Sequence, residues 1–559
     1  MAQDLQTTTR LDVTVPQRSP VREDQARGSG GDVPPERPSS EIDPEVEYES
    51  ADLFEWDESA DVPARADGIG SLSLQSAGAG YMGPQSGNAI LRKLQHIRGS
   101  PLPEEYVPIE ASAQVAVPEE TLKSTWFMND CVDNYFKYYH PAYPILHEGT
   151  FRAQYFGALP KPNDGSWPIL ENIVRSIGAF SSSFCLQNAD YYYYQQASSQ
   201  LSWSILRKGS ISLVQTLCLL ANYLQKRDRP NTGFTLLGVA MNMALGLGLH
   251  REFSASSISP RDMEIRRRVW WTLYIFDSGA RVTFGRATIT INGVTVRQPH
   301  NLDDKDLAVD LARLPPNENR ATVASSLIWQ LKLARIGNLA NEELCRSGQP
   351  NANSMLDFGQ QIDDWSDELP AYMRESTPRP EHDPFEVPRM VLLWRSMHLR
   401  IIIFRPFLLE IVKDRRPLDL TESGTPHSKC LAAASECVLS INIFWGSTHA
   451  HRGSLAWYAF YWLVTATFVH ITCLLYDPVH LEALEWRQMI QLSREALGSL
   501  GDYERLATRA TTIMDQLLGL VPSNPDSTFF DANQLERLEF AEFWNHPWAN
   551  TALFFENGS

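Results

Sequence analysis

Three aspartates in the second half of the sequence have the spacing of a magnesium site. Asp363, Asp364 and Asp367 lie within the run DDWSDE, and carboxylate oxygens are ligands that Mg²⁺ prefers. A site that holds a diphosphate through magnesium needs a second metal-binding cluster on a facing helix, and no matching set of Asn, Ser/Thr and Glu follows downstream. The run also leads directly into Leu369 and Pro370. We therefore interpret it as the acidic, solvated end of a helix.

The cysteines do not have the pattern of a metal site. The sequence contains seven, widely scattered and without a CxxC pair, which indicates reduced thiols inside a cell. Cys430 and Cys437 are separated by six residues, as in some zinc clusters, but the intervening residues are helical in character and no further cysteine is near. Structural zinc needs about four ligands. We expect no metal and no cofactor in this chain.

Motifs for catalysis are also missing. Residues 246–250 (GLGLH) lack the third glycine and the preceding strand of a dinucleotide site, and the sequence has no P-loop and no HExxH. His449 and His451 have no carboxylate nearby, which is typical of a loop. No elbow motif places a nucleophile beside its base. The sequence assigns no catalytic residue, and we expect the protein not to be an enzyme.

The elements that carry these residues are predicted to be helices. From Tyr81 onward, apolar residues recur at i, i+3, i+4 and i+7, and no series of alternating strands interrupts them. The fold class is therefore all-α, with helix packed on helix. Helical patterns cover residues 127–139, 213–224, 234–249, 263–284, 324–345 and 390–412, and the ordered region ends with residues 492–520.

Charged residues within the predicted helices need partners. Asp277 falls among apolar residues, where an unpaired carboxylate is costly, so we predict a structural ion pair with Arg281 or Arg268. The triplet of residues 266–268 (RRR) stands beside two tryptophans in an amphipathic pattern. This favours structural or surface ion pairs over a nuclear-import signal or phosphate contacts.

Charge and hydropathy limit the partners. With 49 Lys+Arg against 67 Asp+Glu, the formal charge is −18, so the whole-molecule field repels phosphate and we do not expect unaided binding to DNA. Residues 1–35 lack the apolar core of a secretion signal. Residues 453–476 are apolar over a length that spans a bilayer. Their hydroxyl and imidazole side chains favour a buried core helix and no membrane contact.

Both ends of the sequence differ from the helical body. Residues 1–77 read as disordered and contain an acidic, aromatic patch (residues 41–62) with Phe54 and Trp56, typical either of an activation segment or of a solvated linker. Residues 521–559 form an acidic-aromatic tail. We favour docking on the body for residues 535–548 and partner recruitment for the end that carries Phe554 and Phe555.

Several motifs in order resemble one family, the fungal zinc binuclear cluster transcription factors, in their fungal-specific or xylanolytic-activator-type regulatory domain. The motifs are residues 81–94 (YMGPQSGNAILRKL), 135–151 (YFKYYHPAYPILHEGTF), 213–225 (LVQTLCLLANYLQ), 247–251 (LGLHR), 266–277 (RRRVWWTLYIFD), 285–286 (GR), 365–370 (WSDELP), 398–408 (HLRIIIFRPFL) and 455–469 (LAWYAFYWLVTATFV). The resemblance spans about residues 81–520, so we place the regulatory domain at 78–520.

The resemblance implies a nuclear regulator of RNA polymerase II transcription that restrains or exposes activation surfaces for the transcription machinery or co-regulators. In the family's core motif we expect structural roles for Leu247, Gly248, Leu249, His250, Arg267, Arg268, Trp270, Trp271, Asp277, Gly285 and Arg286. Gly248 is the expected C-cap of the first motif helix.

Two departures from the family pattern matter. The usual GRP reads Gly285, Arg286 and Ala287, which we expect to loosen the turn after the core helix. The six-cysteine cluster is absent, because the first cysteine is Cys131. We therefore expect zinc only with a missing N-terminal cluster, and DNA contact through that cluster or through a DNA-binding relative in a homo- or heterodimer. An unrecognised DNA-binding element is disfavoured by the net acidity.

Two other functions stay open at this stage. The chain could be a stand-alone helical module that binds a small molecule between its helices, with Trp270, Trp271, Trp394, Trp457 and Trp462 as aromatic lining, although we favour plain core packing for each. A magnesium-dependent prenyl-diphosphate enzyme built on Asp363, Asp364 and Asp367 is the remote third.

Overall fold

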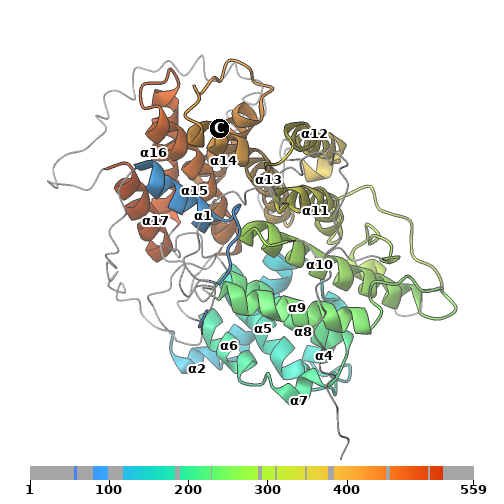
Figure 1. Ribbon diagram of the computed structural model, residues 1–559. Coiled ribbons are helices and arrows are strands. Elements are labelled where there is room, and N and C mark those ends of the chain that lie inside the picture. The colour runs from blue at the N-terminus through green and yellow to red at the C-terminus, as the bar shows by residue number, and fades with distance from the viewer. Residues whose placement is uncertain are drawn as a thin grey trace, which may run out of the picture. The chain divides into compact units, whose positions relative to one another are not determined.

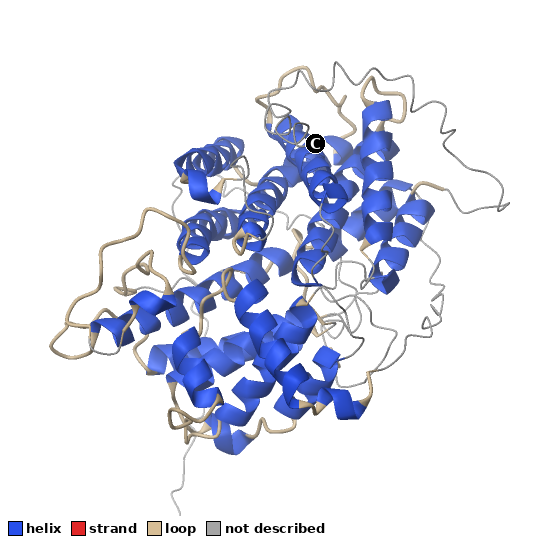
Figure 2. Ribbon diagram, turned by 180° about the vertical axis from the view of Figure 1, so that it is seen from behind, coloured by secondary structure: helices blue, strands red, loops and turns tan. Residues whose placement is uncertain are grey.

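The computed structural model describes eleven stretches of the chain: residues 56–58, 80–98, 117–182, 189–227, 229–287, 293–308, 311–346, 349–374, 383–447, 453–500 and 504–519. The predicted disordered segment (1–77) and tail (521–559) lie outside these stretches, except for residues 56–58. Every regular element in the described stretches is helical, which confirms the all-α prediction (Figure 2).

The first part of the helical body contains the smaller helices. In chain order these are α1 (Gly87–Arg98), α2 (Glu119–Leu122), α3 (Thr125–Asn134), the π-helical turn η2 (Tyr135–Tyr139), α4 (Glu148–Tyr155), α5 (Trp167–Ser181), α6 (Ala189–Ser198), α7 (Trp203–Leu206), α8 (Ile211–Gln225) and α9 (Pro230–Gly246). Here α8 packs along α9, and α5 packs against α6, α3 and α8 (Figure 1).

The second part contains the longer helices. They are α10 (Pro260–Phe284), the short 3₁₀ turn η3 (Asp304–Asp306), α11 (Ser325–Leu344), α12 (Ala352–Glu368), the 3₁₀ turn η4 (Ala371–Met373), α13 (Glu386–Lys413), α14 (Pro426–Ser447), α15 (Gly453–Tyr476), α16 (Ala483–Ser499) and α17 (Glu504–Leu517). Helices α13, α14, α15 and α16 pack together, while α10 and α11 connect them to the first part through contacts with α8, α9 and α13.

Helix α15 is the apolar run that has the length of a membrane span. Its residues 455–476 are apolar enough to pass that test, and 94% of the most apolar window is buried inside the protein. The hydroxyls of Thr465, Thr467 and Thr472 donate to backbone carbonyls one turn earlier, at 2.9, 2.7 and 2.7 Å, so these polar groups need no outside partner. The structure thus places the run as a core helix, as predicted.

Two glycines end the motif helices in the left-handed conformation. Gly248 has φ +65°, and the Leu249 amide donates to the Ala244 carbonyl at 2.9 Å, the bond that closes a Schellman turn. Gly248 is therefore the predicted cap, although α9 itself ends at Gly246, before the predicted residue 249. Gly285 has φ +61° and caps α10 in the same way.

Other predicted boundaries are wrong in detail. We expected one helix over residues 127–139, but α3 passes at residue 135 into η2, where the His140 amide donates to the Tyr135 carbonyl at 2.9 Å. This wider turn keeps both Tyr135 and Tyr139 in the core. The last residues that we expected to be ordered, 492–520, belong largely to α16 and α17.

Candidate functional site: a cavity between α8, α10, α13 and α15

A cavity lies where α8, α10, α11, α13 and α15 meet. It has about 900 Å³ of empty space, counting its open mouth, and about 100 Å³ of it admits the centre of a water molecule. One water needs roughly 10–15 Å³ by the same measure. The space is therefore large enough for a small organic molecule, and ligand sites between helices are a common arrangement.

Lys226 enters the cavity from the end of α8. It stands directly after the apolar run of that helix, at the C-terminal end where a cation is favoured by the helix dipole. Only 4% of the residue is exposed, and its ammonium group donates to the Asn222 Oδ1 at 2.8 Å. Burial, with Arg395 as a second cause, lowers the pKa of Lys226 to about 7.

Aromatic rings surround the Lys226 ammonium group. Its Nζ lies 5.2 and 5.8 Å from the ring centroids of Tyr139 and Tyr143, and 5.7 and 5.1 Å from those of Trp457 and Tyr458. Cation–π attraction stabilises a desolvated cation by about 2 kcal/mol. The rings thus offset part of the cost of burial without supplying a negative charge.

Helix α13 supplies the other polar groups. Arg395 donates through Nη2 to the Tyr143 hydroxyl at 3.3 Å, and that hydroxyl lies 2.5 Å from the Tyr458 hydroxyl. His398 is 5% exposed, and burial, together with Arg405 and Arg395, lowers its pKa to about 3, so its ring is neutral near pH 7. Neither ring nitrogen of His398 has a hydrogen-bond partner in the described structure.

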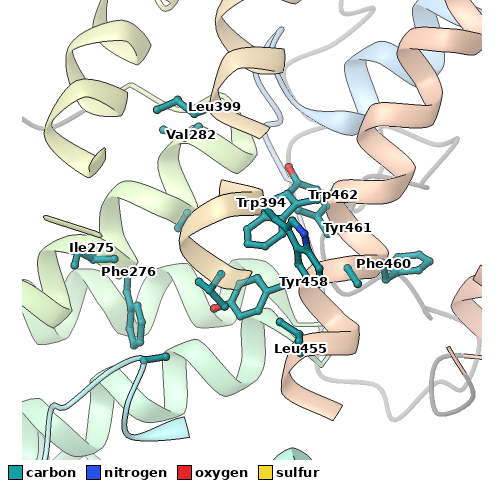
Figure 3. Packing of buried hydrophobic residues seen from close by; sticks show 14 of the residues in the cluster. Ile275, Phe276, Val282, Trp394, Leu399, Leu455, Tyr458, Phe460, Tyr461 and Trp462 are labelled. Carbon is teal, nitrogen blue, oxygen red and sulfur yellow. The ribbon is translucent and has the colours of Figure 1, made fainter. Parts of the chain in front are cut away.

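Two of the five tryptophans proposed as lining contact the cavity, Trp457 and Trp462. Trp394 lies just behind them: its ring packs edge-on against Trp462 at 6.2 Å, and its Nε1 donates to the Ser440 hydroxyl at 3.0 Å (Figure 3). Trp270 and Trp271 are core residues of α10 that do not line the cavity. Three of the five tryptophans are therefore packed in the core and do not line the cavity.

Sequence reasoning missed the cavity's polar residues, Lys226, Arg395 and His398. One local signal was available, because Lys226 directly follows a helix whose residues 213–224 are all buried. A lysine in that position lies either at the surface or, if it is buried, beside groups that stabilise its charge. Nothing in the sequence indicates that Arg395 lies near it, since the two helices are far apart along the chain.

The arginine triplet at the start of α10 has structural partners, as predicted. Arg266 donates to the Leu247 carbonyl at 2.7 Å and lies over the Phe253 ring. Arg267 forms ion pairs with Glu264, at 3.0 Å, and with Glu252. These contacts tie α10 to the turn that contains Gly248 and to the loop that follows it.

Arg268 belongs to a buried cluster around Asp304. The Arg268 Nη1 lies 2.5 Å from one carboxylate oxygen of Asp304, and the His140 Nε2 and the Glu148 amide lie 3.2 and 2.6 Å from the other. Burial by itself raises the pKa of Asp304, but His140 and Arg268 hold it below its usual value. The cluster joins η2, α4, α10 and η3.

The remaining core-motif residues also have contacts within the fold. Asp277 pairs with Arg281 at 2.8 Å, the nearer of its two predicted partners. The Trp271 Nε1 donates to the Arg297 carbonyl at 2.8 Å, and the His250 ring packs against Trp270 at 5.8 Å. Leu249 is fully buried.

Arg286 links three segments that are distant in sequence. It donates to the Tyr81 carbonyl at 3.0 Å and to the Asn231 Oδ1 at 2.6 Å. The Arg286 amide also donates to the Arg281 carbonyl at 2.9 Å. These hydrogen bonds close the turn after α10, and the loosening expected from Ala287 in place of proline stays a prediction.

The acidic run on α12 is occupied by contacts within the protein. Asp363 forms an ion pair with Arg400 at 2.6 Å, Glu368 with Lys332 at 3.0 Å, and Asp364 accepts from Gln360 at 2.9 Å. Within the described stretches no three His, Cys, Asp or Glu side chains are grouped as metal ligands. The run therefore reads as a structural helix face.

Cys430 and Cys437 are buried thiols. Their sulfur atoms lie 3.9 Å from the Ile401 carbonyl and 4.0 Å from the Trp462 carbonyl. Burial raises the pKa of Cys430 to about 12 and that of Cys437 further, so neither is a thiolate at neutral pH. Thiolate is the form that binds metal.

Part of the predicted activation segment contacts the body. The Glu58 carboxylate accepts hydrogen bonds from the Asn231 and Thr232 amides at 3.0 and 2.8 Å, at the N-terminus of α9. A carboxylate is favoured there by the unpaired amides and the helix dipole. Nearby, Trp56 is 48% exposed. Phe54 and the tail residues Phe554 and Phe555 lie outside the described residues.

Comparison with known proteins identifies the helical body. Residues 132–369 match the family described as the fungal specific transcription factor domain. The chain is 29% identical over 395 residues to the lactose regulatory protein LAC9 of Kluyveromyces lactis, covering 68% of this chain and 42% of that protein.

A second relative is the activator of stress genes 1 of Saccharomyces cerevisiae, which is 24% identical over 59% of this chain and 35% of that protein. A third is the transcriptional activator protein acu-15 of Neurospora crassa, which is 23% identical over 60% of this chain and 38% of that protein. The chain spans less than half of the length of these relatives. No solved structure matches.

Proposed function

Because this chain is a member of the fungal transcription factors that carry the fungal-specific transcription factor domain, we propose that it regulates RNA polymerase II transcription in the nucleus of a fungus. The family and the relatives are transcriptional regulators and not enzymes. The helical body would then act as the regulatory half of a transcription factor, which binds the transcription machinery or co-regulators in one of two states.

The observation that carries this proposal is the match of residues 132–369 to the fungal specific transcription factor domain. The cavity adds a place where a regulatory ligand could bind. It lies at the junction where α8 and α10 meet α13 and α15, so a ligand there contacts helices from both parts of the body. A ligand shifts a two-state equilibrium only when it binds the two states with different affinity. A site built from several packed helices satisfies that condition when their packing changes.

Contact with DNA is proposed to come from a partner or from an N-terminal zinc cluster outside the given sequence. The formal charge of −18 opposes phosphate binding, and the given residues hold no six-cysteine cluster. Either that cluster or a homo- or heterodimer with a DNA-binding relative would supply both the zinc and the base contacts.

Two measurements test the proposal. In the first, the purified chain is titrated with a fluorescent library of short DNA duplexes across a salt series, with and without zinc. We expect only weak, salt-sensitive binding, and specific zinc-dependent binding would contradict the partner requirement.

In the second, the chain is fused to a foreign DNA-binding domain in a fungal reporter strain. We expect reporter transcription to change, and an unchanged reporter together with unchanged transcripts in a deletion strain would refute regulation.

A second candidate function is a stand-alone module that binds a small molecule. The cavity favours it as much as it favours a ligand-controlled regulator. A ligand that stabilises the chain without any effect on reporter transcription would select the module.

A further inference from the structure

The cavity has an unbalanced charge. Lys226 and Arg395 both line it, and no Asp or Glu is among the lining residues within the described part of the chain. In contrast, the buried Arg267 and Arg268 each contact a carboxylate at 3.0 Å or less. Buried charges in proteins are usually paired. An uncompensated charge in a desolvated site costs roughly several kcal/mol, unless the group changes its protonation state and becomes neutral. A pair of cations without a counterion calls for an anion from outside the chain.

We propose that the cavity binds a small organic anion, a carboxylate with an apolar body, and that Lys226 and Arg395 bind its oxygen atoms. This proposal rests on the regulatory function above and assigns the chemical class of the effector. A guanidinium group and an ammonium group that line one cavity match the two oxygens of a carboxylate.

The apolar part of the ligand is assigned from the rest of the lining. Trp457 and Trp462 of α15, Phe276 of α10 and Leu399 of α13 line the same cavity. These side chains favour a ring or a short hydrocarbon chain over a fully hydrated oxyanion such as phosphate. The neutral ring of His398, which offers one donor and one acceptor, can bind an additional hydroxyl or carbonyl group.

Binding is expected to depend on pH through Lys226 itself. The titratable and charged groups that face it are Tyr139 and Tyr143, Arg395 and His398 of α13, and Tyr458 of α15, and none of these is a carboxylate. Burial raises the pKa of Tyr139 and of Tyr458 well above the usual value, and His398 stays neutral. Lys226, whose pKa is about 7, is therefore the group that titrates near neutrality. A bound anion favours its charged form, so binding takes up a proton and strengthens as pH falls through 7.

The location of the cations explains how such an anion would regulate. Lys226 belongs to the end of α8 and Arg395 to α13, so one carboxylate would hold together two helices that otherwise carry like charges. Without the anion, the repulsion between these groups disfavours the close arrangement. The anion would therefore stabilise the state in which the two parts of the body are tightly packed.

The experiment uses the purified full-length chain and two probes of equal shape, benzoate and its neutral amide, benzamide. Calorimetric titration in two buffers of different ionisation enthalpy measures affinity and proton uptake, and thermal unfolding measures stabilisation. We expect benzoate to bind and to take up a proton, and benzamide and inorganic phosphate to bind at least about tenfold more weakly. If benzamide or phosphate binds as well as benzoate, or if benzoate does not bind at millimolar concentration, the proposal is wrong.

Two variants locate the site. Lys226→Met keeps a chain of similar length without the charge, so it should abolish proton uptake and weaken benzoate binding about tenfold or more, while the unliganded protein unfolds at the same or a higher temperature. Lys332→Met is the matched control, because Lys332 is a surface lysine that also lies over a tryptophan, at 3.9 Å from the Trp329 ring. Unchanged benzoate binding by Lys226→Met would overturn the assignment.

The reporter strain separates this inference from the proposed function. A reporter that responds to the fused chain although no carboxylate binds the cavity would refute the anion site and keep the regulator. Benzoate binding with proton uptake, but no effect of the chain on transcription in either assay, would support the anion site and refute the regulator.

Discussion

The backbones of Gly83 and Gly285 touch. The Gly83 amide donates to the Phe284 carbonyl at 2.8 Å, and a Cβ added to Gly83 would lie 1.9 Å from the Gly285 carbonyl oxygen. The segment before α1 is thus held against the end of α10, the helix that carries the family's core motif and one wall of the cavity.

We expect Gly83→Ala to lower the free energy of unfolding by roughly 1–3 kcal/mol, because the methyl group meets backbone that cannot rotate away. Urea unfolding followed by circular dichroism measures this. Gly238→Ala is the matched control, since a Cβ at that helical glycine of α9 meets nothing within 4 Å. It should leave stability unchanged or raise it by about 0.5–1 kcal/mol. Equal effects of the two substitutions would contradict the close approach.

We expect Asp304→Asn to destabilise the protein by about 1–3 kcal/mol, because it removes the nearer of the two carboxylates that pair with the buried Arg268 guanidinium; the other, Glu264, lies 3.6 Å away. The double variant Asp304→Asn/Arg268→Met should lose less than the sum of the two single variants, since the contact between these two side chains is then lost only once. Unfolding free energies of the four proteins form the test. Additive losses would show that the two side chains do not depend on each other.

Stability without ligand should rise between about pH 7 and pH 10 because of Lys226. The pKa of its folded form is about 7 and its ordinary value is 10.5, so in this window the unfolded chain holds a proton that the folded chain lacks. The difference in urea midpoint between the native protein and Lys226→Met should therefore shrink as pH rises from 7. A constant difference across that range would mean that Lys226 keeps its proton when buried.

Two buried histidines should destabilise the fold in mild acid. Burial lowers the pKa of His398 and of His470 to about 3, below the ordinary 6.5. Between these values the unfolded chain binds more protons, so stability falls as pH decreases from 6.5. The variant His470→Phe should flatten the slope of stability against pH between 6 and 4. An unchanged slope would exclude His470 as a cause.

The contact between Glu58 and α9 should protect the acidic segment. Loss of an N-terminal capping carboxylate costs about 0.5–2 kcal/mol locally, so Glu58→Ala should accelerate limited proteolysis around residues 56–58 severalfold. The overall unfolding midpoint should change little. If the segment is an activation surface, the same variant should also raise reporter transcription. Cleavage at the native rate would argue that the contact is not populated in solution.

The sequence predicts those features that depend on near neighbours in the chain. The helix stripes, the cap at Gly248 and the pair Asp277–Arg281 are all readable because their partners lie within one or two helical turns.

The features that join distant segments could not be read in this way. The Arg268–Asp304 pair connects α10 with η3, and Lys226 and Arg395 line one cavity only because α8 and α13 both border it in the fold. A single sequence carries no pattern for such pairings. The five tryptophans show the same limit, since exposure to a cavity depends on the packing of neighbouring helices and not on residue type.

The position of α15 has a consequence for biosynthesis. This helix contacts α1, α5, α13 and α14, which precede it, but also α16 and α17, which are made after it. Until those two helices emerge from the ribosome, part of a 24-residue apolar segment has no cover and resembles a membrane anchor. The nascent chain therefore exposes this apolar surface for a time, and its burial depends on helices that follow α15 in the sequence.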